Sequence, residues 1–250
     1  MSPGLEVVVI VAAIGVGAFV KGATGGGLPL LAIPVMAVFI GVERAVVVMA
    51  VPGVVSNGWL VWTHRETARQ TRDLPVLLAA CIVGTAVGTV LLEWLPGRVL
   101  SATLAAMIIT YIVVSTARPG FSFPPRVTRF TSPPVGLIAG GLQGSTGISG
   151  PLLSTYLHGY HLTQRAYVFS LGALFLVGAM VQVVTLALVG LYTGNRFLES
   201  VLVLVPILAL MPLGSKAARR LSPQAFRKVV LVLLAASAFT LIYDALVGSA

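Results

Sequence analysis

The chain has 250 residues, of which 57% are hydrophobic and only 9% are charged, and its mean hydropathy is +1.01. This composition leaves no room for a soluble domain and predicts an all-α integral membrane protein. The net charge of +9 is carried by short clusters of Lys and Arg between apolar runs, a pattern typical of loops that flank membrane spans rather than of a nucleic-acid-binding surface.

The first apolar segment, from Leu5 to Ile40, is too long for one straight span. At about 1.5 Å per residue it would reach roughly 50 Å, against a hydrocarbon core of about 30 Å. Glycines and Pro29 in its middle predict two shorter helices joined by irregular backbone. Three further segments complete the first half: Ala45–Trp62, Pro75–Leu92 and Val99–Thr116.

The second half repeats this order after a stretch rich in proline and arginine. We predict a linker at about residues 117–134, a broken segment from about Val135 to Tyr160, and then three segments: Ala166–Leu191, Leu198–Leu213 and Lys228–Val247. Residues 1–250 would thus form a single transmembrane domain with internal repeats at about 5–116 and 135–247.

The middle of each broken segment carries the same motif. Lys21-Gly-Ala-Thr-Gly-Gly-Gly-Leu-Pro-Leu-Leu31 recurs as Gln143-Gly-Ser-Thr-Gly-Ile-Ser-Gly-Pro-Leu-Leu153, at a constant offset of 122 residues. Glycine runs are poor helix formers, and interruptions at corresponding places in two halves of a membrane protein indicate a transporter's binding site. Pro29 and Pro151 fit the first turn of the helix after each break, where no N–H donor is needed.

Loop charge predicts how the two halves are inserted. In the first half the basic residues cluster in residues 63–74, where the corresponding loop of the second half has only Arg196. The bias is reversed one loop later, where the first half has only Arg98 and the second half has a basic cluster in residues 216–228. Under the positive-inside rule the halves have opposite orientations, so the protein is an inverted repeat.

An inverted repeat needs an odd number of crossings in each half. Since each half has three complete segments, each broken segment is predicted to be a re-entrant helical hairpin, the first from outside and the second from the cytoplasm. The N-terminus and the C-terminus would both lie outside, and no cleavable signal sequence is expected. The alternative is eight ordinary spans, with even halves in parallel orientation.

Broken backbone at membrane depth is tolerated only where it is buried in protein or lines a polar cavity. Glycines let backbone N–H groups approach a ligand, and a helix that starts there presents free N–H groups and its positive dipole end, so the predicted ligand is an anion. The predicted substrate-binding residues are those of the two motifs with one amide of the second segment: Lys21, Gly22, Thr24, Gly25, Gly26, Gly27, Gln143, Gly144, Ser145, Thr146, Gly147, Ser149 and Asn57.

Structural alternatives stand beside this prediction. Small residues at four-residue spacing let membrane helices touch, which is an alternative for Gly84 with Gly88 and for Gly136 with Gly140. Lys21 could extend to the membrane interface instead of facing a site. The amides of Asn57 and Gln182 could serve helix–helix hydrogen bonding as readily as a site. Arg44 and Arg165, at matching positions, are predicted to lie at segment ends.

The remaining chemistry is sparse. The acidic residues all fall at or near predicted segment ends: Glu6, Glu43, Glu66, Asp73, Glu93, Glu199 and Asp244. The sequence therefore offers no intramembrane carboxylate for coupling a cation, which favours an anionic substrate. No metal site, cofactor or catalytic set is predicted, and Cys81 is expected to be a small core residue.

These motifs, the chain length and the four hydrophobic units per half resemble the sulfite exporter TauE/SafE family of membrane proteins. The resemblance implies transport of small sulfur-containing or carboxylate anions, such as sulfite, thiosulfate or sulfoacetate, across the bacterial inner membrane. By motif it carries over Gly22, Thr24, Gly25, Gly26, Gly27, Pro29, Gly144, Thr146, Gly147, Gly150 and Pro151. The second copy departs from the glycine pattern, with Ile148 and Ser149 opposite Gly26 and Gly27.

The sequence therefore predicts a secondary transporter of a small anion that works by alternating access of two inverted halves. Its expected partners are the anion and the lipid bilayer, without nucleic acid, and a homo-oligomer is left open. A passive anion channel of the same architecture is the alternative. A membrane enzyme and a purely partner-binding subunit are the other classes, and substrate stabilisation of the folded protein separates a carrier from the latter.

Overall fold

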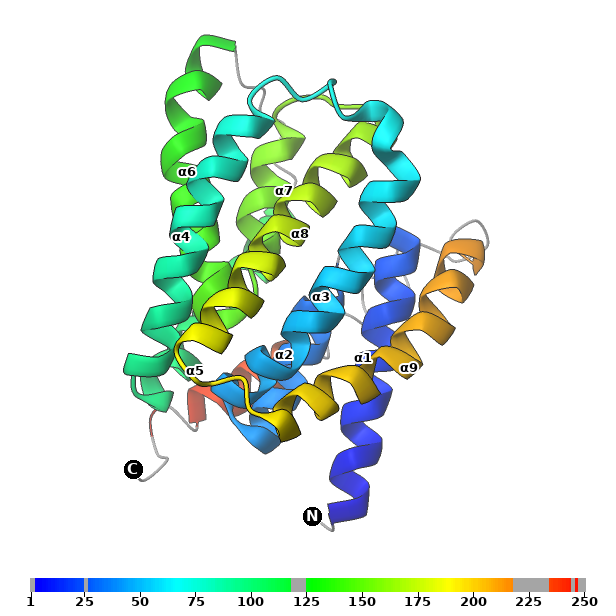
Figure 1. The fold of residues 1–250 in the computed structure, drawn as a ribbon, viewed down its shortest axis with the longest axis vertical. Coiled ribbons are helices and arrows are strands. Elements are labelled where there is room, and N and C mark those ends of the chain that lie inside the picture. The colour runs from blue at the N-terminus through cyan, green and yellow to red at the C-terminus, as the bar shows by residue number, and fades with distance from the viewer. Residues whose placement is uncertain (1–2, 25–26, 118–124, 218–233, 244–245, 247–250) are drawn as a thin grey trace.

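The computed structural model describes residues 3–24, 27–117, 125–217, 234–243 and 246. Within these residues every regular element is a helix (Figure 1), which confirms the all-α prediction. The elements in chain order are α1 (Pro3–Thr24), α2 (Leu28–Ile40), α3 (Val42–His64), the short η1 (Arg65–Thr67), α4 (Leu74–Trp94), α5 (Gly97–Ala117), α6 (Pro125–Thr146), α7 (Gly150–His158), α8 (Gln164–Leu188) and α9 (Gly194–Ala217). A further apolar helical stretch covers Leu234–Tyr243.

Among the described residues, four helices are long and apolar enough to cross a membrane: α3, α4, α8 and α9. Their outward faces carry large apolar side chains, for example Val87, Val184 and Leu202. Apolar residues on the outside as well as the inside are what a bilayer solvent selects, because lipid replaces water around the helix.

Both broken segments are interrupted at the duplicated motif, as predicted. Helix α1 ends at Thr24 and α2 starts at Leu28, while α6 ends at Thr146 and α7 starts at Gly150, so the helix ends keep the offset of 122 residues seen in the sequence. Pro29 and Pro151 lie in the first two positions of their helices. Gly27 (φ 99°) and Gly147 (φ 70°) turn the chain with positive φ angles that other residues rarely adopt.

The helix contacts repeat between the halves. When the two halves are aligned by the offset of 122 residues, α1 matches α6, α3 matches α8 and α4 matches α9. Helix α1 packs on α9 as α6 packs on α4, and α3 packs on α9 as α8 packs on α4. Helices α3 and α8, which match each other, also share a large contact, whereas α1 packs much more extensively on α2 than α6 does on α7. The matched pairs therefore place the two broken segments on either side of a central α3–α8 pair.

Small residues bring α4 and α6 into close contact. A Cβ atom on Gly136 would lie 2.8 Å from the Ala80 side chain, and one on Gly140 would lie 2.8 Å from the Thr85 backbone nitrogen. Gly84 and Gly88 are equally blocked by the backbone of α6. The packing alternative is thus correct for these four glycines. In the matching interface, Gly214 of α9 lies against the Phe19 backbone of α1.

The second broken segment begins earlier than predicted. Helix α6 starts at Pro125 rather than near Val135 and runs through Pro133 and Pro134, which the sequence placed in a linker. Close packing on α4 stabilises this helix, and prolines are tolerated in membrane helices when neighbours satisfy the freed backbone groups. Residues 118–124 of the predicted linker and much of the predicted last segment lie outside the described residues.

Candidate functional site

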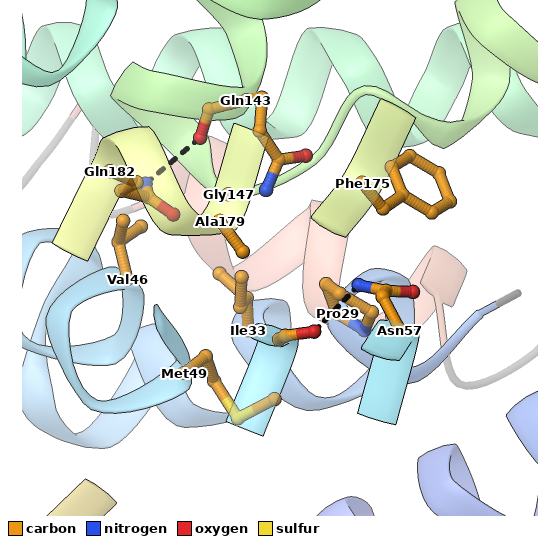
Figure 2. Close-up of a pocket in the computed structure, with 11 residues that line it drawn as sticks. Pro29, Ile33, Val46, Met49, Asn57, Gln143, Gly147, Phe175, Ala179 and Gln182 are labelled. Carbon is orange, nitrogen blue, oxygen red and sulfur yellow. Dashed lines mark hydrogen bonds between the residues drawn. The ribbon is translucent and has the colours of Figure 1, made fainter. Parts of the chain in front are cut away.

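A small cavity lies where the two helix breaks approach each other (Figure 2). It is bounded by α2, α3, the end of α6 and α8. Its lining residues are Pro29, Ile33, Val46, Met49, Gly53, Asn57, Gln143, Gly147, Phe175, Ala179 and Gln182. The predicted site residues Asn57, Gln143 and Gly147 are therefore brought to one place, although they are far apart in the chain.

Lys21 is linked to this cavity through the lining residue Asn57. Its side chain is fully buried, and its Nζ donates a hydrogen bond to Oδ1 of Asn57 over 2.5 Å. Asn57 in turn donates from Nδ2 to the carbonyl oxygen of Gly53 over 2.8 Å. Among the ion pairs of the described residues none involves Lys21. A buried lysine whose partner is a neutral amide is suited to meet an anion, since burying an unpaired charge is costly.

Gln143, which corresponds to Lys21 in the other motif, is held in a similar way. Ser149 donates a hydrogen bond to its Oε1 over 2.9 Å, and Nε2 of Gln182 donates to the carbonyl oxygens of Gln143 and Gly144 over 3.0 and 3.1 Å. Figure 2 shows the side-chain nitrogen of Gln143 on the side of Ala179, inside the cavity. Each motif therefore contacts an amide side chain of the adjacent central helix, Asn57 on α3 or Gln182 on α8.

The starts of α2 and α7 have no side-chain caps. Neither the Gly27 cap of α2 nor the Ser149 cap of α7 makes a side-chain capping hydrogen bond. The Ser149 hydroxyl donates to Gln143 instead. Because the first N–H groups of a helix have no partner within the helix, both starts can donate to a ligand and carry the positive end of the helix dipole.

The other predicted site residues are placed differently. The hydroxyls of Ser145 and Thr146 donate to backbone carbonyls one turn earlier, Gly141 and Leu142, over 2.9 and 2.7 Å. Gly144 faces α4, where a Cβ atom would lie 2.5 Å from the Thr89 nitrogen. In this conformation these three residues support the end of α6 rather than line the cavity.

The other predicted residues of the first motif are described to different extents. Gly22 is a half-buried residue of α1, and Thr24 ends that helix, but the Thr24 side chain is not described. Gly25 and Gly26 lie outside the described residues. Their part in a site stays a prediction.

The sequence missed several residues that line the cavity. Gln182 stood out as a polar residue in an apolar segment but was not assigned to the site. The apolar side chains Ile33, Met49 and Phe175 gave no signal, because most of their neighbours in the sequence are equally apolar.

The cavity is narrow in this conformation. Its volume of about 10 Å³ is close to the smallest space that holds one water molecule. A sulfur oxyanion needs several times that space. An anion of that size fits only if the groups around the cavity move apart.

The starts of the two central helices make different kinds of contact. At the start of α3, Arg44 pairs with Glu199 of α9 through two contacts of 2.5 and 3.1 Å, and Glu43 pairs with Arg196 at 2.8 Å. At the start of α8, the matching contacts are neutral. Thr163 donates to Gln70 over 3.1 Å, and the hydroxyls of Thr71 and Ser170 are 2.7 Å apart. Arg44 and Arg165 thus lie at helix starts, as predicted.

Within the part of the chain that the structure describes, no group of three or more His, Cys, Asp or Glu is placed to hold a metal ion.

A protein-family model described as sulfite exporter TauE/SafE matches residues 9–241, nearly the whole chain. No curated protein and no solved structure matches the chain.

Proposed function

The chain belongs to the sulfite exporter TauE/SafE family of membrane transporters, and we propose that it is a secondary transporter of a small anion in the bacterial inner membrane. The proposed substrates are sulfite, thiosulfate, an organosulfonate such as sulfoacetate, or a related carboxylate. The observation that carries this proposal is the meeting of two helix breaks at one cavity beside the fully buried Lys21.

The electrostatics of the cavity suit an anion. Lys21 supplies a positive charge next to Asn57, Gln143 supplies an amide, and the starts of α2 and α7 supply backbone N–H groups. Discontinuous membrane helices whose starts point at a shared site are a common way to bind anionic groups near the bilayer midplane. We propose that Lys21 provides the charge and that the remaining donors orient the anion.

We propose that the two halves form an inverted repeat and that each broken segment is a re-entrant hairpin. Three observations support this. In Figure 1, α1 rises from the N-terminus whereas α6 descends from the top, and α3 and α8 also run in opposite directions. The contacts of α9 with α1 and α3 have counterparts in the contacts of α4 with α6 and α8. The basic residues cluster in loops that do not correspond between the halves.

Alternating access follows from such an arrangement. The central helices α3 and α8 would keep the anion between them while the hairpins move to open one end and then the other. The pairs Arg44–Glu199 and Glu43–Arg196 would close the end at the starts of α3 and α9, and the neutral hydrogen bonds around Thr71 and Ser170 would close the opposite end. We place both termini outside on the basis of loop charge.

A passive anion channel of the same architecture is the second candidate. The same donors could line a pore, but the narrow cavity favours a carrier because it leaves no room for an anion in this conformation. The two candidates differ in kinetics. A carrier shows saturable flux and counterflow, in which unlabelled substrate inside drives uptake of labelled substrate, whereas a channel shows neither at comparable concentrations.

The test is counterflow of radiolabelled sulfonate or thiosulfate in proteoliposomes. We expect saturable counterflow with the unchanged protein and its loss in Lys21→Met, since the buried charge is removed while the apolar stem is kept. The matched control is Lys216→Met, which removes an exposed lysine in the last turn of α9 and should leave counterflow unchanged. Equal counterflow in both variants would remove Lys21 from the site, and unsaturable flux would favour the channel.

A further inference from the structure

We infer that Ile33 of α2 sets the size of the largest anion that the cavity can hold, and that its side chain occupies space that the substrate takes when it binds. This inference rests on the proposed function, because it identifies a residue that selects among the anions of the proposed site. The property that Ile33 selects is the size of the body that carries the anionic group, and not its charge.

The first observation is the place of Ile33 in the cavity. Its side chain is 1% exposed and belongs to the lining, and Figure 2 shows it between Ala179 and Met49. Pro29, four residues earlier in α2, lines the cavity as well. Residues four apart lie on the same face of a helix. Helix α2 therefore presents this face, with Ile33 on it, to the space between the two helix breaks.

The second observation is the contact of Ile33 with the other break. A Cβ atom added to Gly147 would collide with the Cδ1 atom of Ile33, whereas the side chain of Val46 would be 3.6 Å away. Gly147 is the residue with positive φ in the second break. The tip of the Ile33 side chain thus reaches from the helix after the first break to the backbone of the second. A shorter side chain at position 33 would leave space between the two breaks.

The third observation is that this closure has no matching partner in the lining. The offset of 122 residues pairs Pro29 and Ile33 with Pro151 and Thr155 of α7. Neither Pro151 nor Thr155 belongs to the lining residues, and Thr155 is half-buried. Of the two helices that follow the breaks, α2 therefore limits the cavity. Its volume depends on Ile33 rather than on a symmetric pair of side chains.

An isoleucine has no donor for an anion, so it can act on the substrate only through size and apolar contact. Hydrogen bonds to the anionic group are left to amides such as Asn57 and Gln143. An apolar pocket separates ligands that differ by one methylene group by about tenfold or more. Shortening a buried side chain leaves an apolar cavity that a larger ligand can fill. Ile33→Ala should therefore shift the preference of the site toward longer anions.

The test uses methanesulfonate and propane-1-sulfonate, which share head group and charge and differ in the length of the apolar body. In titration calorimetry, Ile33→Ala should raise the ratio of propane-1-sulfonate affinity to methanesulfonate affinity at least about tenfold over the unchanged protein. The milder Ile33→Val should raise it less. The matched control is Leu31→Ala, which shortens a residue of α2 that is 2% exposed but does not line the cavity, and should leave the ratio unchanged.

The outcomes separate the inference from the proposed function. A ratio that stays constant in Ile33→Ala, or that changes equally in Leu31→Ala, would overturn the role of Ile33. Sulfonate binding by the unchanged protein would still support the proposed function in that case. If the unchanged protein binds no sulfonate, sulfite or thiosulfate, both fail.

A second test needs no ligand. Because Gly147→Ala brings a methyl group against Ile33, the double variant with Ile33→Ala should lose less thermal stability than the sum of the two single losses. Gly190→Ala is the control, since its φ of 79° is also positive and nothing lies within 4 Å of the added Cβ atom. Combined with Ile33→Ala, it should give additive losses. Additive losses for the Gly147 pair as well would contradict the contact of Ile33 with the second break and would overturn the inference.

Discussion

The ammonium group of Lys21 on α1 and the amide oxygen of Asn57 on α3 are joined by a hydrogen bond of 2.5 Å, and both side chains are buried. The bond connects the first broken segment with the wall of the cavity. Because the amide is neutral, it orients the lysine without cancelling its charge. In the proposed site, this lysine would supply the positive charge that an anion neutralises.

Replacing this neutral partner by an acid should block the site from within. In Asn57→Asp the new carboxylate would form an ion pair with Lys21 and compete with the substrate, so anion affinity should fall by about tenfold or more. The thermal stability of the empty protein should be kept. Calorimetric titration and thermal unfolding measure the two effects. Asn195→Asp, at the exposed start of α9, is the control and should leave affinity unchanged.

Both the backbone angle and the surroundings of residue 147 require a glycine. Its φ angle is 70°, and a Cβ atom there would collide with the Ile33 side chain across the cavity. Gly147→Ala should therefore strain the turn by about 1–2 kcal/mol and abolish transport by pressing the break against α2. Gly190→Ala is the matched control, because its φ of 79° is also positive and nothing lies within 4 Å of the added Cβ atom. Similar transport by both variants would mean that strain, not the position at the cavity, sets the effect.

The close contact of α4 and α6 should be sensitive to a single methyl group. Gly140→Ala would place a Cβ atom 2.8 Å from the Thr85 nitrogen, so we expect a loss of about 1–3 kcal/mol in the free energy of unfolding. In Gly58→Ala of α3 the nearest neighbour is 4.0 Å away, and higher helix propensity should make that variant neutral or slightly stabilising. Chemical unfolding in detergent provides the comparison, and unchanged stability of Gly140→Ala would contradict the tight interface.

The ion pair at the start of α3 and α9 should show measurable coupling. The Arg44 and Glu199 side chains are 48% and 32% exposed, so we expect a coupling energy of about 0.5–1 kcal/mol from a double-mutant cycle of Arg44→Gln and Glu199→Gln. High salt should reduce this coupling. The exchanged pair, Arg44→Glu with Glu199→Arg, should recover most of the stability that either single reversal loses. Additive effects of the two substitutions would show that the pair does not hold this end closed.

Asp73, before α4, should make stability depend on pH. Burial alone would raise the pKa of its carboxyl group, but a hydrogen bond from Thr128, together with the hydrogen bond and charge of Arg72, holds that pKa below its usual value. A further hydrogen bond comes from Tyr160, over 3.1 Å. A lowered folded-state pKa stabilises the protein above the unfolded-state value of about 3.9, and this contribution is lost as the pH falls through the folded-state value.

The Asp73→Asn variant should therefore be less stable than the unchanged protein at neutral pH, and the difference should shrink as the pH falls below about 4. Thermal unfolding between neutral and acidic pH measures this. Glu93→Gln, which changes an exposed carboxylate in the last turn of α4, should show a small difference at every pH. A constant difference for Asp73→Asn would contradict the role of its charge.

The helix breaks could be predicted from the sequence because their cause is local. Runs of glycine weaken a helix, and Pro29 and Pro151 are favoured in a first turn, so the positions of the breaks follow from a few adjacent residues. The offset between the motifs then predicted the repeated order of helices. The small residues at Gly84 and Gly140 also indicated close packing in advance.

Other features depend on contacts between residues that are far apart in the sequence. Helix α6 continues through Pro133 because α4 packs against it, which overrides the local preference for a break. From the sequence, the role of Phe175 in the cavity wall could not be distinguished from contact with lipid. Side chains that face lipid and side chains that face an apolar cavity wall are of the same residue types. The hydrogen bonds of Ser145 and Thr146 to their own helix likewise depend on how the end of α6 is placed.

The most direct test of the site is the position of a bound heavy-atom anion. Crystals of the protein soaked with 2-bromoethanesulfonate, a monoanion, should show an anomalous bromine peak in the cavity bounded by Asn57, Gln143 and Gly147. The peak should be absent from crystals of Lys21→Met. A peak confined to Arg44 and Arg196 at the starts of α3 and α9, or a cavity peak that persists in Lys21→Met, would contradict the assignment of the two helix breaks and Lys21 to one anion site.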